Sequence, residues 1–263
     1  MNNKKHIKNK FISERTQSPP KNPPKNISNI LSKISLFEIF PEIFAVVIKD
    51  DKLRARVFMR YQEFYESDSE TFRGKGFKWV DFVKFYKEKT KNDIFSYHED
   101  WSGYNLPCDS IESCIKLIPD INYFDLIMFS IVDTIKEITG NNNFYLIGID
   151  QTDGEDLSLI YHELAHGLWF SSPNYRNLQS YNIKNLNETT FESMSKKIKN
   201  MGYGENVIDD EIQAYLSTGV LPDMARIKDI KKAQIIFKKA FDKFVNKISL
   251  KKIPINWSVD LQR

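Results

Sequence analysis

Two histidines four residues apart, with a glutamate beside the first, lie in one apolar-periodic stretch of the chain. Residues 162–166 read His-Glu-Leu-Ala-His, inside a segment from Asp156 to Phe170 whose apolar residues recur at helical spacing. On an α-helix, residues four apart project from the same face, so His162 and His166 can direct two imidazoles at one metal ion. Glu163 is then close enough to act on a water at that ion without binding the ion. The spacing therefore predicts a metal site.

A metal ion that activates water needs a third protein ligand, and we expect it from an acidic segment further along the chain. The apolar spacing predicts a short helix from Val207 to Leu216. Glu211 is the favoured ligand because its side chain is long, and because the small Ala214 would let this helix pack closely on the histidine helix. Asp209 and Asp210 are the alternative ligands. Both are also candidates for contacting the histidine ring nitrogens that do not face the metal.

This arrangement resembles the gluzincin metallopeptidases, in which two histidines of an H-E-x-x-H motif and a glutamate from a second helix hold zinc. The long spacer between His166 and Glu211 is more similar to the catalytic domain of anthrax lethal factor. The similarity covers roughly residues 144–217. It implies one zinc ion per chain, bound by His162, His166 and Glu211, and a helix-rich zincin-like fold.

A Tyr-Gly pair at Tyr203-Gly204 adds to the resemblance. In the lethal factor domain, a Tyr-Gly precedes the ligand glutamate by about two helical turns, and the tyrosine stabilises the transition state. The resemblance therefore implies Tyr203 as the donor to the oxyanion, with Tyr215 and Tyr175 as alternatives.

Together these residues predict a zinc-dependent peptidase. Glu163 would be the general base that takes a proton from a zinc-activated water and passes it to the leaving amine of a peptide or protein substrate. The alternative is a non-catalytic metal-binding or protein-interaction module that uses the basic tail and the C-terminal helix. The presence of Glu163 favours the peptidase, because a structural metal site needs no general base there.

The segment from Asn143 to Asp150 is rich in aromatic and branched residues, which predicts a strand just before the histidine helix. In metallopeptidases of the kind that this chain resembles, such a strand edges the cleft and pairs with an extended substrate. We therefore expect an edge strand here, with an ordinary core strand as the alternative. Thr152 or Asp153 is the expected N-cap of the following helix.

The composition is that of an ordinary globular protein, with 41% hydrophobic and 28% charged residues. No apolar run approaches the roughly 18–20 residues of a membrane helix, and no apolar segment follows the N-terminal charges as in a signal peptide. The two cysteines, Cys108 and Cys114, do not make a disulfide framework. These features predict a cytoplasmic protein with reduced thiols.

Positive charge is concentrated in residues 1–26, which hold seven Lys or Arg and one Glu. The remainder has 31 basic residues (38 − 7) and 34 acidic ones (35 − 1), a net charge of −3. With two Pro-Pro pairs in this segment, the pattern predicts that residues 1–30 form a disordered basic tail. The body has no basic excess, which argues against nucleic acid as a partner except through the tail.

The rest of the chain predicts an α+β fold with two lobes, an N-terminal α+β lobe over residues 31–140 and a catalytic lobe over residues 141–263. Apolar periodicity predicts a helix or strand at 53–65 and irregular structure at 97–107. It predicts helices at 79–89, 120–138 and 224–248.

Overall fold

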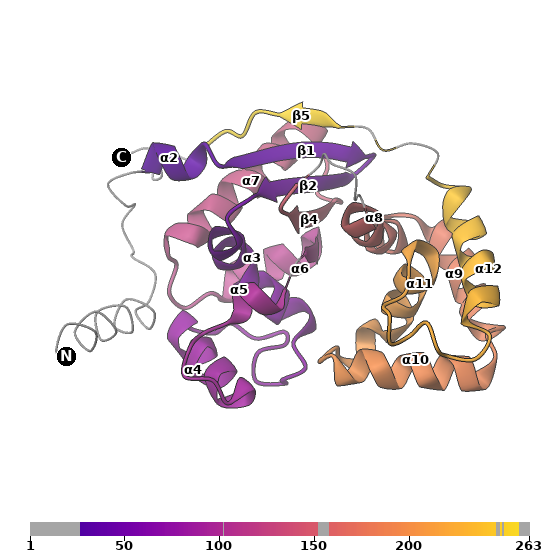
Figure 1. The fold of residues 1–263 in the computed structure, drawn as a ribbon. Helices are drawn as coiled ribbons and strands as arrows, with labels where there is room; N and C mark the ends of the chain where they lie inside the picture. Colours follow the sequence, from indigo (N-terminus) through magenta and orange to yellow (C-terminus); the bar gives the residue numbers. More distant parts are fainter. Residues whose placement is uncertain (1–26, 102, 152–157, 246–247, 249, 258–263) are drawn as a thin grey trace, which may run out of the picture.

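A computed structural model describes residues 27–101, 103–151, 158–245, 248 and 250–257. It is a mixed α+β structure built on one five-stranded sheet, in the order β3-β4-β2-β1-β5 (Figure 1). β4 runs parallel to β2, and the other neighbouring strands are antiparallel. The strands are β1 (Ile34–Phe40), β2 (Ile43–Ile48), β3 (Tyr104–Pro107), β4 (Tyr145–Ile149) and β5 (Lys251–Ile253).

The strand predicted at residues 143–150 is present as β4, but its expected place at the sheet edge was wrong. β4 lies between β3 and β2, and all five of its residues are buried. The edge beside the histidine helix is β3, in the segment 97–107 that we expected to be irregular. That segment contains helix α5 (Tyr97–Asp100) and β3, which at four residues each are too short to show a period.

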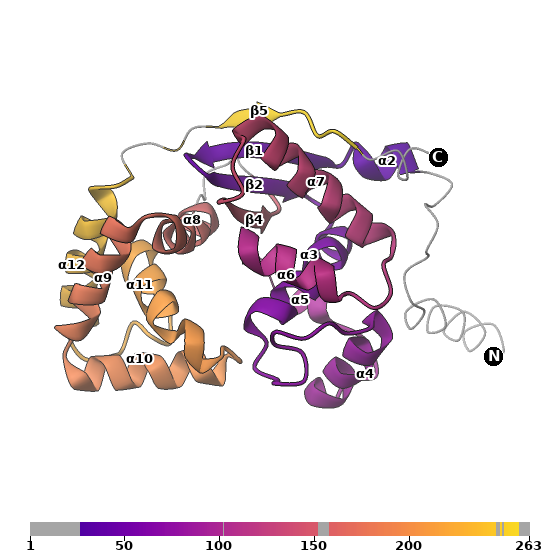
Figure 2. The same cartoon turned by 180° about the vertical axis from the view of Figure 1, so that it is seen from behind.

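Alternating side chains of the central strand β2 enter two different cores, because successive residues of a strand point to opposite faces. Phe44 and Val46 pack with the helices on one face, whereas Ile43 and Ala45 pack with α8 on the other. The helices of the first face and its surroundings are α2 (Ile27–Leu31), α3 (Asp51–Glu66), α4 (Trp79–Thr90), α5, α6 (Cys108–Leu117) and α7 (Tyr123–Thr139). With the sheet they form what we call the sheet lobe (Figures 1 and 2).

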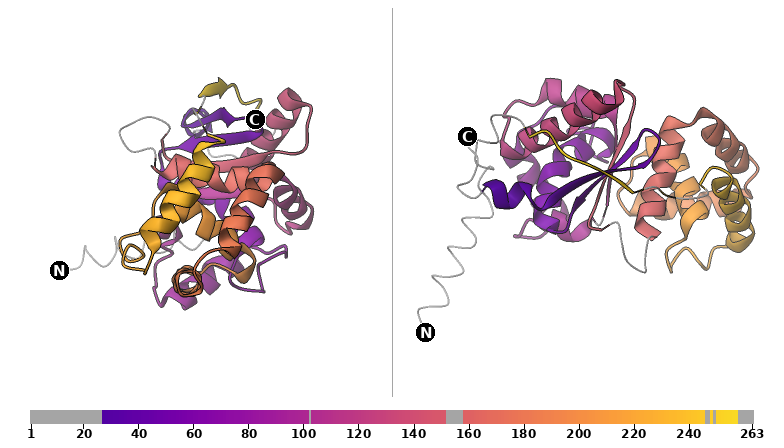
Figure 3. Two further views of the ribbon diagram at one scale, coloured as in Figure 1. Left: turned by 90° about the vertical axis from the view of Figure 1, so that its right-hand side faces the viewer. Right: turned by 90° about the horizontal axis from the view of Figure 1, so that it is seen from above.

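The remaining helices form a helical lobe beside the sheet lobe, as the views in Figure 3 show. α8 packs directly on the sheet, where Gly167 leaves room for Ile43, whose Cδ1 would lie 2.8 Å from a β-carbon at residue 167. The elements of this lobe are α8 (Ser158–Ser171), α9 (Pro173–Lys184), α10 (Glu188–Asn200), the 3₁₀ turn η1 (Glu205–Val207), α11 (Ile208–Thr218) and α12 (Ile230–Asp242).

The helices predicted at 79–89 and 120–138 are confirmed as α4 and α7. α7 begins at a capping box on Asn122 and ends at Gly140, whose φ of 61° suits the left-handed C-cap. The segment 53–65 is helical, within α3. The long helix predicted at 224–248 was wrong in extent, because α12 spans only Ile230–Asp242. A turn precedes it, with Asp229 in the left-handed region (φ 58°).

The basic tail, apart from residues 27–30, and both predicted caps, Thr152 and Asp153, lie outside the described residues. β4 and β5 follow residue 140 but complete the same sheet as β1, β2 and β3. Both cysteines are buried and neither forms a disulfide. No described helix combines the length and the apolar character needed to cross a membrane.

Candidate metal centre

His162, His166 and Glu211 converge where α8 packs against α11. The two Nε2 atoms of the histidines lie 3.3 Å apart. Glu211 faces both rings, with Oε1 3.6 Å from His166 Nε2 and Oε2 3.9 Å from His162 Nε2. Ala214, which is fully buried, lets the two helices approach as the sequence suggested. Among the described residues, these three form the group with donor atoms close enough to hold one metal ion.

The other ring nitrogen of each histidine is held by a neighbour on α11. His166 Nδ1 lies 3.0 Å from Asp210 Oδ1, and His162 Nδ1 lies 3.4 Å from the hydroxyl of Thr218. The Thr218 hydroxyl donates its own proton to the Ala214 carbonyl at 2.7 Å, so its oxygen is free to accept from His162. Both rings are thereby oriented with Nε2 toward Glu211. In its neutral form, with the proton on Nδ1, each ring would present a lone pair at Nε2, as a metal ligand must.

The donor set fits zinc. Two imidazole nitrogens at the usual Zn–N distance in a tetrahedral site lie about 3.3–3.4 Å apart, and the two nitrogens here are separated by 3.3 Å. Glu211 Oε2 is buried and has no hydrogen-bond partner among the described residues. A carboxylate oxygen in that position is costly unless a cation or a donor faces it. Two histidines and one glutamate supply three protein ligands, so the fourth position of a tetrahedral zinc ion would be open to water or substrate.

The ionisable side chains of this cluster shift one another's pKa values. Burial raises the pKa of Glu211 to about 8, against the opposing effect of His166. Burial lowers the pKa of His162 well below its ordinary value, and the charge of His166 adds to this. Burial also lowers the pKa of His166, but Asp210 and Glu211 outweigh it and raise that pKa well above its ordinary value. Glu211 and His166 therefore hold protons near neutral pH, which a metal ion would displace on binding.

Glu163 lies beside this cluster, on the α8 turn that carries His162. Its side chain is buried, and burial raises its pKa to about 7, with His166 and a hydrogen bond from Asn105 acting in the opposite direction. The Asn105 side-chain oxygen accepts a hydrogen bond from the Tyr145 hydroxyl at 2.8 Å, so its amide group is the one that faces Glu163. Glu163 Oε2 is buried and lacks a partner among the described residues. It is free to take a proton.

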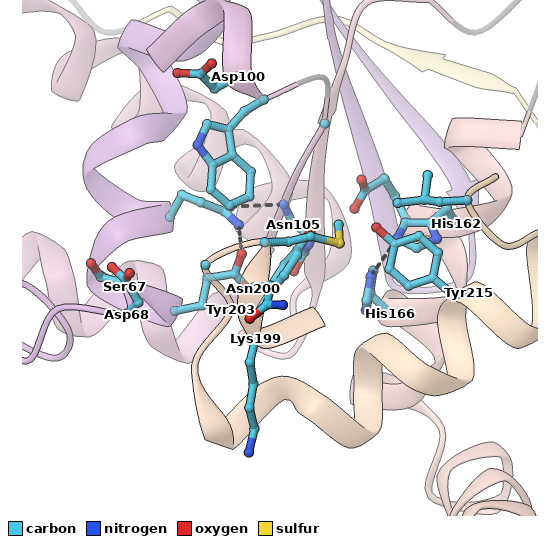
Figure 4. Close-up of a pocket in the computed structure, with 18 of the residues that line it drawn as sticks. Ser67, Asp68, Asp100, Asn105, His162, His166, Lys199, Asn200, Tyr203 and Tyr215 are labelled. Carbon is cyan, nitrogen blue, oxygen red and sulfur yellow. Dashed lines mark hydrogen bonds between the residues drawn. The ribbon is translucent and has the colours of Figure 1, made fainter. Parts of the chain in front are cut away.

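The three tyrosines weighed as oxyanion donors fall into two groups. Tyr203 and Tyr215 line the same cavity as the histidines (Figure 4). The ring of Tyr215 lies 4.7 Å from that of His162, and Tyr203 packs edge-on against Trp101 with ring centroids 5.9 Å apart. Burial, followed by the charge of Glu211, raises the pKa of Tyr203, so it keeps its proton. Tyr175 is fully buried and donates to Gln213, away from the cavity.

A cavity of about 1050 Å³ lies between the two lobes, with the histidines in its wall. In Figure 4, His162, His166 and Tyr215 lie on one side of it, and Ser67, Asp68 and Asp100 lie on the other. The edge strand β3 borders this cavity through Asn105. The backbone N–H of Asn105 donates to Gln62 Oε1 at 3.2 Å, so a side chain of α3 already occupies that donor of the edge.

The structure brings together all of the predicted ligand and base residues and places Asp210 behind His166, whereas Asp209 is exposed. Sequence reasoning missed Thr218 and Asn105. A signal for Thr218 was present, because it lies seven residues after Glu211 and therefore shares its helix face, two turns away. No local signal marks Asn105, since its contact with Glu163 depends on how β3 packs on α8.

Comparisons of this chain with protein families, with curated proteins and with solved structures find no match.

Proposed function

We propose that this chain is a zinc-dependent peptidase in which His162, His166 and Glu211 hold the metal and Glu163 is the general base. The observation that carries the proposal is the convergence of three metal-ligating side chains from two helices, with a buried, free carboxylate oxygen beside them. A site that served only to stabilise the fold would not need Glu163 to face the same cavity. The fit of the two histidine nitrogens to a tetrahedral zinc site supports the same assignment.

A bound zinc ion would supply Lewis acidity at the open position, polarising a carbonyl and lowering the pKa of water. Glu163 takes a proton from the attacking water as the new C–O bond forms. It then delivers that proton to the leaving nitrogen as the C–N bond breaks, so that the carboxylate is regenerated. Asn105 holds the carboxylate in place during both transfers. Tyr203, which lines the same cavity, donates a hydrogen bond to the developing oxyanion.

The cavity supports a polypeptide substrate. Its volume of about 1050 Å³ is at the upper end of the range for small-molecule sites. It is lined from both lobes, by Trp101 and Asn105 on the sheet side and by Tyr203 and Leu221 on the helical side. A segment of chain lying between the lobes would place one peptide bond beside Glu163.

Metal content and turnover, measured on the same samples, test the proposal. The purified chain is reconstituted with zinc, analysed for bound metal and incubated with casein and with a mixture of quenched fluorescent peptides. We expect about one zinc per chain and cleavage that a chelator abolishes. Glu163→Gln should keep the zinc and lose cleavage by several orders of magnitude, because the general base is gone while the ligands remain.

Glu192→Gln, an exposed position on α10, is the matched control and should behave as the wild type. A wild-type chain that binds no zinc after reconstitution would overturn the proposal. Zinc binding without cleavage of any peptide, unchanged by Glu163→Gln, would instead establish the non-catalytic metal-binding module.

A further inference from the structure

A continuous run of buried polar contacts extends from the His166 ring into the helical lobe. It begins at Asp210, whose Oδ1 lies 3.0 Å from His166 Nδ1. Gln213, one turn later on α11, donates from Nε2 to the same Oδ1 at 2.9 Å. One carboxylate oxygen therefore lies in ion-pair contact with the metal ligand and accepts a hydrogen bond from its own helix. Gln213 Nε2 also donates to the carbonyl of Ala165 on α8 at 3.2 Å, which joins the two metal-bearing helices.

The orientation of the Gln213 amide is determined by its partners. Tyr175 on α9 donates its hydroxyl proton to Gln213 Oε1 at 2.7 Å. A flipped amide would place its carbonyl oxygen against Asp210 Oδ1 and the Ala165 carbonyl, which are both acceptors. Tyr175 is held in turn by Gln179, whose Nε2 lies 3.2 Å from its hydroxyl and 3.0 Å from Ser217 Oγ. Gln179 extends the run to the Phe237 carbonyl and to Asn182.

The geometry of α11 separates this run from the metal cavity. Glu211, Tyr215 and Thr218 recur at i, i+4 and i+7 and face the histidines. Asp210, Gln213 and Ser217 recur at i, i+3 and i+7 on the adjacent face, which is turned toward α9. Tyr175, Gln179 and Gln213 have no exposed surface at all. Fully buried polar side chains are costly, and apolar residues of similar shape would fill the same space.

We propose that Gln213 and Tyr175 are positioning residues that fix Asp210 and, through it, the orientation of His166 for the metal. The inference rests on the proposed function, since it requires that His166 bind zinc. Gln213 holds the carboxylate of Asp210 so that Oδ1 faces His166 Nδ1. Tyr175 holds Gln213 so that its amide nitrogen, and not its oxygen, faces Asp210. Neither residue touches the cavity, so neither contacts a substrate.

The test compares zinc affinity in the full chain with Gln213→Met, Tyr175→Phe and a control, Tyr61→Phe. Methionine keeps the length of glutamine and removes both donors and the acceptor. Tyr61 is also buried and also donates its hydroxyl to a carboxylate, Asp125, at 3.3 Å, but in the sheet lobe. The zinc dissociation constant is measured by competition with a chromophoric chelator. The visible spectrum of the cobalt-substituted chain reports the geometry of the ligands.

We expect Gln213→Met to weaken zinc binding about tenfold or more, in the range found for residues that support metal ligands, and to alter the cobalt spectrum. Tyr175→Phe should weaken binding several-fold, and Tyr61→Phe should leave both readouts unchanged. Wild-type affinity and spectrum in both Gln213→Met and Tyr175→Phe would overturn the inference while leaving the zinc site in place.

A wild-type chain that binds no zinc would instead remove the proposed function and this inference with it. Circular dichroism establishes that each variant is folded. If Gln213→Met does not fold, Tyr175→Phe decides the question, because it removes only one oxygen and keeps the ring packed against Phe241 and Phe244.

Discussion

The backbone at Gly103 lies directly against the carboxylate of Glu163, although the two residues belong to different lobes. A β-carbon at position 103 would overlap Glu163 Oε1 and would lie 3.0 Å from Leu159 Cδ1. Gly103 immediately precedes the edge strand that carries Asn105, so the start of β3 shapes the space in which Glu163 sits. A side chain at position 103 would therefore displace the end of the Glu163 side chain and not a backbone atom.

Gly103→Ala is therefore expected to displace the Glu163 carboxylate without touching the ligands. A misplacement of about 1 Å at a reacting group can cost about 100-fold in rate, so we predict a loss of ten- to a hundredfold in kcat. Zinc content should remain at the wild-type level. Cleavage rates and metal analysis on the same preparation check this. Full activity in Gly103→Ala would show that Glu163 tolerates the shift, and loss of zinc would show a wider disturbance of α8.

The roles of the neighbouring acids Asp210 and Glu211 can be separated by amide substitutions that keep their shapes. Glu211 faces both Nε2 atoms, whereas Asp210 faces the far nitrogen of His166. We predict that Glu211→Gln abolishes stoichiometric zinc binding. Asp210→Asn should retain one zinc with an affinity about 10- to 100-fold lower, since it loses only the support behind His166. Equilibrium dialysis measures both, and the reverse result would make Asp210 the third ligand.

The sequence predicted the centre of the site and not its surroundings, for a physical reason. His162, Glu163 and His166 follow from helical periodicity within one element, and Glu211 follows from a second element of the same kind. Asn105, Gly103 and Trp101 reach the site only because a short strand packs beside α8. Such contacts depend on the tertiary arrangement, which leaves no local period to detect.

The strands also show that contacts between distant segments cannot be predicted from a local pattern. β4 is rich in aromatic and branched residues and was found from the sequence, but its position between β3 and β2 was not. Residues of these types are found both in edge strands and in interior strands. β4 is an interior strand because it pairs with β2, which is distant in the sequence. β3 was missed because its four residues include an asparagine and a proline, which are depleted in strands.

Tyr203 and Tyr215 both line the cavity, and phenylalanine substitutions distinguish their roles. A donor that acts only on the oxyanion contributes to kcat and hardly to substrate binding, and its removal typically costs about 100- to 1000-fold. We predict this loss for Tyr203→Phe, with KM little changed. Tyr215 packs on the His162 ring, so Tyr215→Phe should retain most of the activity. Steady-state kinetics on one peptide check both, and the opposite ranking would assign the role to Tyr215.

A buried glutamate of the sheet lobe, away from the metal ligands, makes the stability of the fold depend on pH. Burial raises the pKa of Glu63 from 4.5 to about 7, while the neighbouring Ser67 and Tyr97 side chains and the charge of Lys89 act in the opposite direction. The nearby carboxylate of Asp68 raises it slightly. The folded state therefore holds the Glu63 proton more tightly than the unfolded state does. Its contribution to stability is complete below about pH 4.5 and is lost as the pH rises through about 7.

Glu63→Gln should remove this dependence, because glutamine fills the same space and never ionises. A difference of about 2.5 pKa units corresponds to about 3 kcal/mol in the free energy of unfolding. We therefore predict that wild type and variant unfold at the same urea concentration near pH 4.5, and that the variant is the more stable at pH 8 by up to that amount. The exposed Glu88→Gln should follow the wild type at both pH values. An equal stability of wild type and Glu63→Gln at pH 8 would show that Glu63 ionises in the folded chain without cost.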